Sequence, residues 1–120
     1  MTAADEIAAI TRAIQFYVDG ARNGSSTTMR EAFHEGATIF GYENGELFSG
    51  PIQRLFDWLD QNGPASALQA KLTQIDVVET IATVRLELEN WTGTNYTDLF
   101  TLLKVGTGWK ITNKVFHIRP

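Results

Sequence analysis

The strongest constraint on this 120-residue chain is a change in hydrophobic periodicity at Ala67. Before this residue, apolar side chains recur at steps of three and four, which is the pattern of amphipathic helices. After it, apolar and polar residues alternate through ALQAKLTQIDVVE, TIATVRLELENW, NYTDLFTLLKV and WKITNKVFHIR. A period of two predicts four long strands, and the short turns between them predict an antiparallel meander. Helices followed by long strands are typical of an α+β fold.

The first part of the chain predicts three helices and a short hairpin. Residues 3–22 form an amphipathic helix that Thr2 or Asp5 can cap, and GSSTTMREAF predicts a turn and a short second helix. GATIFGY predicts a strand, and ENGE predicts an Asn-Gly turn that leads into a second short strand. We expect the acids of this turn to point outward into solvent. SGPIQRLFDWLDQNGP predicts the third helix, with Ser49 as its N-cap.

Composition narrows the class of protein. The length and the absence of a linker or repeat predict a single domain over residues 1–120. A net charge of −4, with Lys and Arg scattered singly, predicts no binding to nucleic acid or to an anionic membrane. The absence of cysteine excludes disulfides, thiolate catalysis and Cys-ligated zinc. The N-terminus opens with acids instead of a basic segment, so we expect no signal peptide and a cytoplasmic protein.

Alternation also assigns the faces of the late strands. The residues expected to face the helices are Ala82, Val84, Leu86 and Leu88, then Tyr96, Asp98, Phe100 and Leu102, then Trp109, Ile111, Asn113, Val115 and His117. The same rule places Lys114 and Phe116 on the outer face. Because both faces carry apolar residues, we expect the outer face to be covered by a second copy of the chain in a homodimer.

The order of elements resembles the nuclear transport factor 2-like superfamily. FHEGATIFGY, then LFSGPIQRLFDWL, then TDLFTLLKVGTGWKITNKVFH look like its bacterial branch of SnoaL-like and "putative lumazine-binding" proteins. This resemblance covers nearly the whole chain. It implies a cystatin-like curved antiparallel sheet wrapped round the N-terminal helices, an α-β-α-β-β-β cone that dimerises. Relatives include isomerases, dehydratases, cyclases and non-catalytic binding modules, so function must be inferred from the site.

The resemblance also implies a set of catalytic candidates. Ketosteroid isomerases of this shape use a carboxylate base in the first strand, a tyrosine on the first helix and a protonated acid on a late strand. Tyr17 falls on the tyrosine position, but the base position falls at or beside Gly41 and the acid position falls on Phe100. Dehydratase-like relatives pair a helix tyrosine with an aspartate and a histidine, which implies Tyr17, Asp98 and His117. Asp98 would orient the imidazole as a base, and Tyr17 would polarise a carbonyl or phenol oxygen.

A structural role remains open for each candidate. A buried tyrosine usually packs its ring in the core and satisfies its hydroxyl. Asp98 equally fits a contact with a threonine, with Lys114 or with a helix terminus, because a buried acid needs a partner. His117 equally fits the end of a strand, three residues from the C-terminus. An isomerase mechanism would need Asp98 or Glu43 to act from a shifted position.

An apolar, aromatic-lined pocket inside the cone is the expected binding site, with Gly41 leaving room where a relative holds its base. Its expected lining is Phe33, Ile39, Gly41, Leu55, Trp58, Leu59, Val84, Leu86, Leu88, Phe100, Asn113 and Val115. Such a pocket suits a hydrophobic or aromatic small molecule. No His-x-His or His-x-x-x-His spacing occurs, so we expect no metal and no cofactor. Three functions stay open: a small-molecule-binding protein, a cofactor-independent isomerase, dehydratase or cyclase, and a dimeric interaction module without a ligand.

Overall fold

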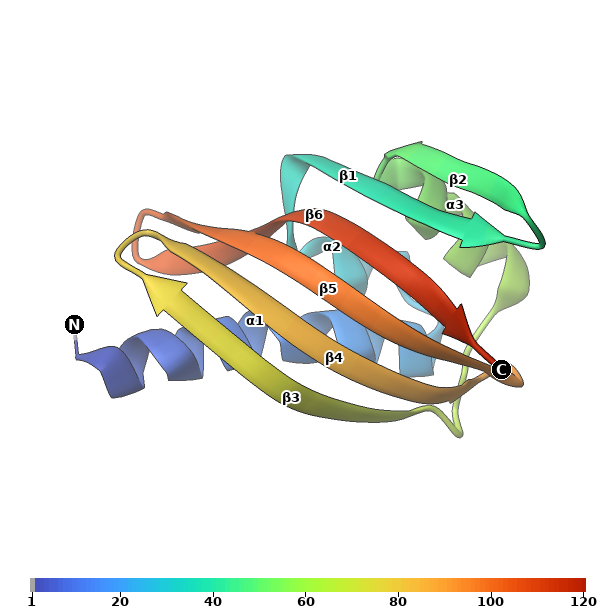
Figure 1. The fold of residues 1–120 in the computed structure, drawn as a ribbon, viewed down its shortest axis with the longest axis horizontal. Coiled ribbons are helices and arrows are strands. Elements are labelled where there is room, and N and C mark those ends of the chain that lie inside the picture. The colour runs from blue at the N-terminus through green and yellow to red at the C-terminus, as the bar shows by residue number, and fades with distance from the viewer. Residues whose placement is uncertain (1) are drawn as a thin grey trace.

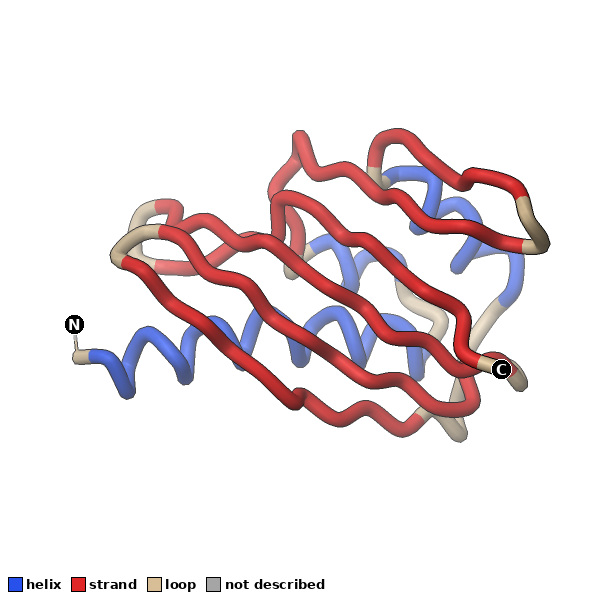
Figure 2. Tube along the Cα trace, in the orientation of Figure 1, coloured by secondary structure: helices blue, strands red, loops and turns tan. Residues whose placement is uncertain are grey.

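The computed structural model describes residues 2–120, which form three helices and one six-stranded sheet (Figure 1). The elements are α1 (Ala3–Asn23), α2 (Ser26–Arg30), β1 (Phe33–Glu43), β2 (Glu46–Pro51), α3 (Gln53–Asn62), β3 (Gln69–Val78), β4 (Ile81–Trp91), β5 (Thr94–Val105) and β6 (Gly108–Arg119). The strand order is β2-β1-β6-β5-β4-β3, antiparallel except for the parallel pair β1 and β6. The sheet curves over the helices, which lie on its concave side (Figures 1 and 2). The predicted α+β fold is confirmed.

Helix α1 carries the first candidate, Tyr17, into the interior. A capping box fixes its start, in which the Thr2 hydroxyl accepts from the Asp5 backbone N–H at 3.1 Å and the Asp5 carboxylate accepts from the Thr2 N–H at 3.1 Å. Its end is a left-handed residue, Gly24 with φ 65°, whose N–H donates back to the last turn. With both ends held, the apolar stripe of α1 packs on the concave face of the sheet and buries Tyr17 completely. No helix in residues 2–120 is long and apolar enough to cross a membrane.

The corner between β2 and α3 places α3 over one end of the concave face. Ser49 lies in β2 and the N-cap of α3 is Ile52, without a side-chain cap bond, so the prediction of Ser49 as N-cap is wrong. The corner is held in other ways. The Ile52 N–H donates to the Ala37 carbonyl of β1 at 2.9 Å, and the Arg54 guanidinium donates to the Ser49 carbonyl at 2.7 Å. These bonds set the start of α3, which buries Leu55, Phe56 and Leu59.

A β-bulge interrupts β6. Thr101 of β5 is opposite Asn113, but the next residue, Leu102, is opposite Ile111, so Thr112 is an extra residue in β6. A bulge changes the face of every residue that follows, because side chains in a strand alternate with a period of two.

This bulge reverses the faces predicted for the end of β6. Lys114 and Phe116 are buried on the concave side, whereas Val115 is 43% exposed and His117 is exposed. The prediction that Val115 and His117 face inward, with Lys114 and Phe116 outward, is therefore wrong. Its error is the assumption of uninterrupted alternation after Ile111.

A second irregularity reorients the end of β4. Leu88 is opposite Tyr96, and the next pair is Trp91 opposite Thr94. Asn90 has a positive φ of 59°, a left-handed conformation that asparagine tolerates better than most residues. This kink buries Trp91 on the concave side, at the last residue of β4 before the turn into β5.

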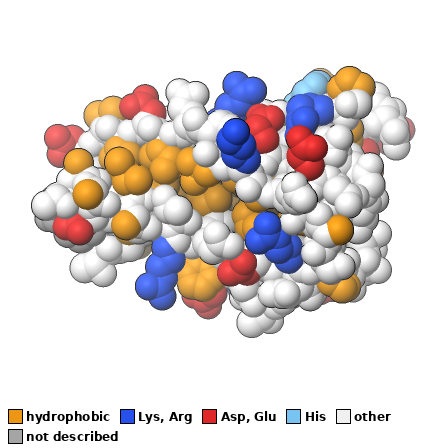
Figure 3. Space-filling model, turned by 90° about the horizontal axis from the view of Figure 1, so that it is seen from below, with side chains coloured by type: hydrophobic (Ala, Val, Ile, Leu, Met, Phe, Trp, Pro, Cys, Tyr) orange, Lys and Arg blue, Asp and Glu red, His pale blue; other side chains and the backbone are white. Residues whose placement is uncertain are grey.

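An open hollow lies at the opposite end of the cone, between the N-terminal half of α1 and β3. Its volume is about 580 Å³. Figure 3 shows hydrophobic side chains gathered on this side of the molecule, toward the N-terminus. The hollow is lined by Ala3, Glu6, Ile7, Ile75, Val77, Glu79, Thr80 and Lys104. Its Lys104 is already paired with Glu6 at 3.0 Å, so Glu79 is the one charged lining residue that makes no ion pair among the described residues.

Candidate functional site

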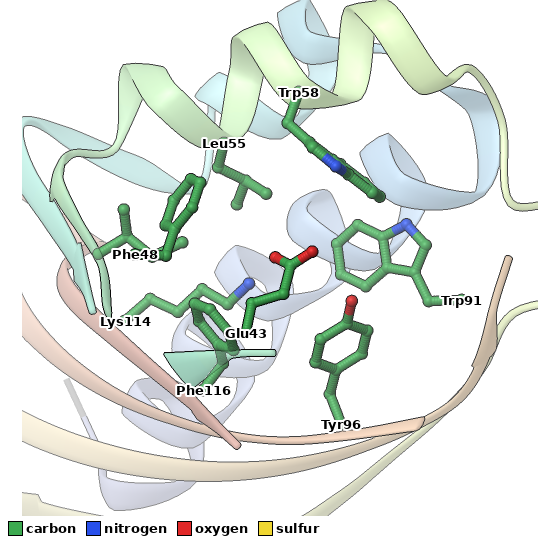
Figure 4. A pocket seen from close by; sticks show the side chains of 9 residues that line it. Glu43, Phe48, Leu55, Trp58, Trp91, Tyr96, Lys114 and Phe116 are labelled. Atoms are coloured by element: carbon green, nitrogen blue, oxygen red, sulfur yellow. The ribbon is translucent and has the colours of Figure 1, made fainter. Parts of the chain in front are cut away.

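A small cavity lies between α3 and the concave face of β1, β6 and the end of β4 (Figure 4). Its lining residues are Ile39, Glu43, Phe48, Leu55, Trp58, Trp91, Tyr96, Lys114 and Phe116. The free volume is about 40 Å³, which is room for a few waters. Most of the wall is aromatic, and three polar groups face the space: an amine, a carboxylate and a phenol. Ile39, Leu55 and Trp58 are the predicted pocket residues that line it.

Tyr17 and Asp98 meet beneath this cavity. The Tyr17 hydroxyl donates to Asp98 Oδ2 at 2.7 Å, and both side chains are fully buried. Burial raises the pKa of the Asp98 carboxyl, and the nearby Lys114 and the Tyr17 hydrogen bond lower it only in part. Burial and the Asp98 charge raise the pKa of Tyr17 well above its usual value. Tyr17 therefore stays protonated and donates, and the structure brings two of the three catalytic candidates, Tyr17 and Asp98, together.

Lys114 is the basic neighbour of that pair. Its Nζ lies 3.8 Å from Asp98 Oδ2, longer than a hydrogen bond, and its side chain is only 4% exposed. Three rings surround the amine, with centroids 5.1 Å away for Tyr17, 5.3 Å for Trp91 and 5.4 Å for Phe116. Burial lowers the pKa of Lys114, and the Asp98 charge opposes that change. The result is a shielded amine that faces the cavity.

Glu43 and Tyr96 stand at the mouth of the cavity. Glu43 is exposed, but it shares a strand face with Ile39, and Figure 4 shows its carboxylate directed toward the centre of the lining side chains. The interpretation of the ENGE acids as all pointing away from the pocket is therefore wrong for Glu43. Burial raises the pKa of Tyr96, and the charges of Glu43 and then Asp98 raise it further. The mouth thus combines a carboxylate with a protonated phenol.

Gly41 does not leave room for a ligand. A Cβ at this position would lie 2.4 to 2.5 Å from three ring carbons of Phe116. The missing side chain is therefore replaced by the Phe116 ring, which packs edge-on against Phe48 and Tyr96 with centroids 6.1 and 6.0 Å away. The expectation of space beside Gly41 is wrong because Phe116 faces inward after the bulge.

The other predicted site residues lie outside the cavity lining. His117 and Val115 are on the outer face, so His117 does not join Tyr17 and Asp98. Asn113 donates from its amide to the Thr38 hydroxyl at 2.9 Å. The remaining predicted lining residues are buried in the core: Phe33, Leu59, Val84, Leu86, Leu88 and Phe100. Within residues 2–120, no group of three His, Cys, Asp or Glu side chains could hold a metal ion.

The sequence pattern did contain a signal for the missed residue Lys114. In WKITNKVFHI, the buried positions Trp109 and Ile111 are odd-numbered, whereas the apolar residues Phe116 and Ile118 are even-numbered. A change of phase inside one strand indicates a bulge. Allowing for it turns Lys114 inward, on the same side as Asp98.

The polar side chains at the cavity are of the kinds that take part in proton transfer and carbonyl chemistry in other proteins. A shielded lysine stabilises negative charge on an oxygen when it is protonated, and it is a nucleophile when it is neutral. A carboxylate at the mouth can accept and return a proton. The Tyr17 hydroxyl holds the Asp98 carboxylate in place, and the Lys114 amine lies 3.8 Å from that carboxylate in the cavity wall.

Comparison with known proteins agrees with this fold. Residues 5–117 match the family described as "Putative lumazine-binding". The chain is 39% identical over 105 residues to the aldolase FrzH of Cladobotryum sp, covering 87% of this chain and 84% of that protein.

Solved structures of nuclear transport factor 2-like proteins of unknown function are also similar. The protein from Shewanella baltica is 38% identical, with a TM-score of 0.95 over 100% of this chain and 98% of that one. The protein from Methylobacillus flagellatus is 46% identical, with a TM-score of 0.96 over 99% and 96%. The chain belongs to the "putative lumazine-binding" family of the nuclear transport factor 2-like superfamily.

Proposed function

We propose that this protein is a cofactor-independent enzyme that makes or breaks a carbon–carbon bond next to the carbonyl group of a small molecule, as an aldolase does. The observation that carries the proposal is the shielded amine of Lys114 in the wall of an aromatic cavity, backed by the hydrogen-bonded Tyr17–Asp98 pair. The 39% identity to a protein named an aldolase supports the same class of reaction.

The reaction needs two kinds of group, and the cavity holds both. A base removes a proton from the carbon beside the carbonyl, and the electron pair moves toward the carbonyl oxygen. Glu43 is the base in this proposal, because its carboxylate is directed into the cavity from the solvent side. Lys114 stabilises the charge that develops at the carbonyl. The carbanion carbon then attacks a second carbonyl carbon, and Glu43 returns its proton to the new alkoxide.

The cavity also limits the substrate. About 40 Å³ admits the reacting carbonyl and its immediate neighbours, far less than the roughly 300–1,000 Å³ that encloses a drug-sized ligand. The rest of the molecule therefore extends past the mouth, where Trp58 and Tyr96 offer flat apolar surface. A hydrophobic or aromatic carbonyl compound with a small reacting end fits these walls.

Exchange of carbonyl-adjacent protons with deuterated water tests the proposal without a known substrate. Proton NMR would follow small ketones, such as acetone and hydroxyacetone, with wild type, Lys114→Met and Lys71→Met. Lys71 is exposed on β3, outside the cavity lining, and serves as the matched control. We expect exchange with wild type and Lys71→Met and background exchange with Lys114→Met. Background exchange with wild type for every small ketone tested would reject carbonyl chemistry.

A binding protein without turnover is the second candidate. The mainly aromatic wall of the cavity supports it, because such walls hold flat apolar molecules. Native mass spectrometry of gently purified protein distinguishes the two. A tightly retained small molecule that is recovered unchanged favours binding, and bare protein that exchanges ketone protons favours catalysis.

We also propose that the protein is a homodimer through the outer face of the sheet. Phe40, Val115 and Leu99 are opposite one another in register across β1, β6 and β5, and they are 42%, 43% and 53% exposed. Beside them, Arg85 and Glu87 form an ion pair at 3.1 Å, so both charge signs border the row. Such a surface is self-complementary, so it can pack against the same surface of a second copy across a two-fold axis. Sedimentation should show a dimer that Leu99→Lys dissociates, and a wild-type monomer would reject the proposal.

A further inference from the structure

We propose that Lys114 is a nucleophile that forms a Schiff base with the carbonyl carbon of the substrate. This inference rests on the carbonyl chemistry proposed above and deepens it, since Lys114 could also serve that chemistry by charge alone. The two roles differ in whether a covalent bond forms between the protein and the substrate.

The first argument is the position of the amine. The bulge at Thr112 turns Lys114 inward, and its Nζ faces the cavity while the rest of the side chain is buried. Three ring faces at 5.1 to 5.4 Å restrict where the amine can move. Surface lysines are mobile and strongly hydrated, whereas this amine is held at one place in a dry wall. A carbonyl that enters the cavity meets Nζ at its inner end.

The second argument is where the proton of Lys114 can go. Asp98 Oδ2 accepts the Tyr17 hydrogen bond, but Oδ1 is buried without a hydrogen-bond partner among the described residues. A proton on Oδ1 would leave the Tyr17 bond intact. Moving that proton from Lys114 to Asp98 removes two opposite charges from a dry site, which favours the neutral pair. Burial shifts both pKa values in this direction, lowering that of Lys114 and raising that of Asp98. The neutral amine has the lone pair that attack requires.

The covalent step balances as follows. The Nζ lone pair bonds to the carbonyl carbon, and the π electrons move to the oxygen, which takes a proton from a carboxylic acid of the site. The attacking nitrogen, now positively charged, gives one of its protons to the carboxylate so formed. That carboxylic acid passes the proton to the new hydroxyl, which leaves as water while the nitrogen lone pair forms a positively charged imine on Lys114. Glu43 then removes the proton from the neighbouring carbon, and the electron pair is drawn toward the cationic nitrogen. After the new carbon–carbon bond forms, water adds to the imine carbon and releases Lys114.

Reductive trapping tests for the bond directly. Wild type, Lys114→Met and Lys71→Met would be incubated with acetone and sodium cyanoborohydride, and the adducts located by peptide mass mapping. We expect an isopropyl group on Lys114 in wild type and Lys71→Met, formed at least tenfold faster than on the exposed lysines. A rate on Lys114 no faster than on Lys71 would overturn the inference.

Loss of oxygen-18 from labelled acetone gives a second readout that needs no variant. Schiff-base formation replaces the carbonyl oxygen with water oxygen, whereas an enolate keeps it. Wild type should release the label at least as fast as it exchanges the neighbouring protons. Proton exchange with retained label would overturn the Schiff base but leave the proposed carbonyl function standing. If wild type showed neither proton exchange nor reductive trapping, both the Schiff base and the proposed carbonyl function would be rejected. The oxygen measurement decides even if Lys114→Met fails to fold.

Discussion

Replacing Gly41 by alanine should destabilise the protein because the ring of Phe116 occupies the place of the missing side chain. The new Cβ would lie 2.4 Å from the nearest ring carbon, where ordinary contact begins at 3.4 Å. Gly41 is not among the residues with positive φ, so its backbone accepts alanine without strain. The effect of Gly41→Ala therefore measures packing alone.

The magnitude follows from how far the ring must move. A retreat of about 1 Å, from 2.4 to 3.4 Å, pushes Phe116 into the cavity and disturbs its edge contacts with Phe48 and Tyr96. Overpacking of this kind costs about 1–3 kcal/mol. When Phe116 is also truncated to alanine, the clash is gone, and Gly41→Ala should be neutral or stabilise the strand by up to about 1 kcal/mol. The expected coupling between the two positions is the difference between these costs, about 1–4 kcal/mol.

Urea unfolding of wild type, the two single variants and the double variant measures this coupling, with the three tryptophans as the fluorescence signal. Gly108→Ala is the matched control, because a Cβ there meets nothing within 4 Å and Gly108 has no positive φ. It should change the free energy of unfolding by less than about 1 kcal/mol. An equal cost of Gly41→Ala with and without the Phe116 ring would refute the packing argument.

Three further predictions concern the buried polar groups. Tyr17→Phe removes the hydroxyl that donates to Asp98, and should lower the free energy of unfolding in urea by about 1–3 kcal/mol. Asp98→Asn and Lys114→Met should each lower the free energy of unfolding by about 1–3 kcal/mol, because each leaves the other buried polar group without its neighbour, and the double variant should cost clearly less than their sum; additive costs would contradict an interaction. The pKa of Asp98 is raised in the folded state above 3.8, so the folded protein binds this proton more tightly than the unfolded chain does. The stability of wild type relative to Asp98→Asn should therefore be highest below pH 3.8 and fall as the pH rises through the raised pKa; a rise over that interval would contradict the assignment.

The sequence predicted what depends on local periodicity. The helix of Tyr17 and the strand of Asp98 follow from steps of three and four and from steps of two, and both side chains face inward as expected. Their contact was also predictable, because an inward acid on a central strand lies over the helix that the sheet covers. Glu43 was harder to place, since a charged residue beside an Asn-Gly turn is usually solvated. Glu43 is separated from Ile39 by an even number of positions in the same strand, so both side chains lie on the same face, and this spacing was the better guide to its position.

Three of the residues that the sequence missed share one cause, an extra residue in a strand. Trp91 follows the kink at Asn90, and Lys114 and Phe116 follow the bulge at Thr112. An extra residue in a strand leaves its composition and propensity unchanged but moves every later side chain to the other face. Without the Thr112 bulge, Val115 and His117 would face Asp98, and the amine of Lys114 would lie in solvent. The chemistry of the cavity thus depends on one backbone irregularity, which a pattern of alternating residues shows only as a change of phase.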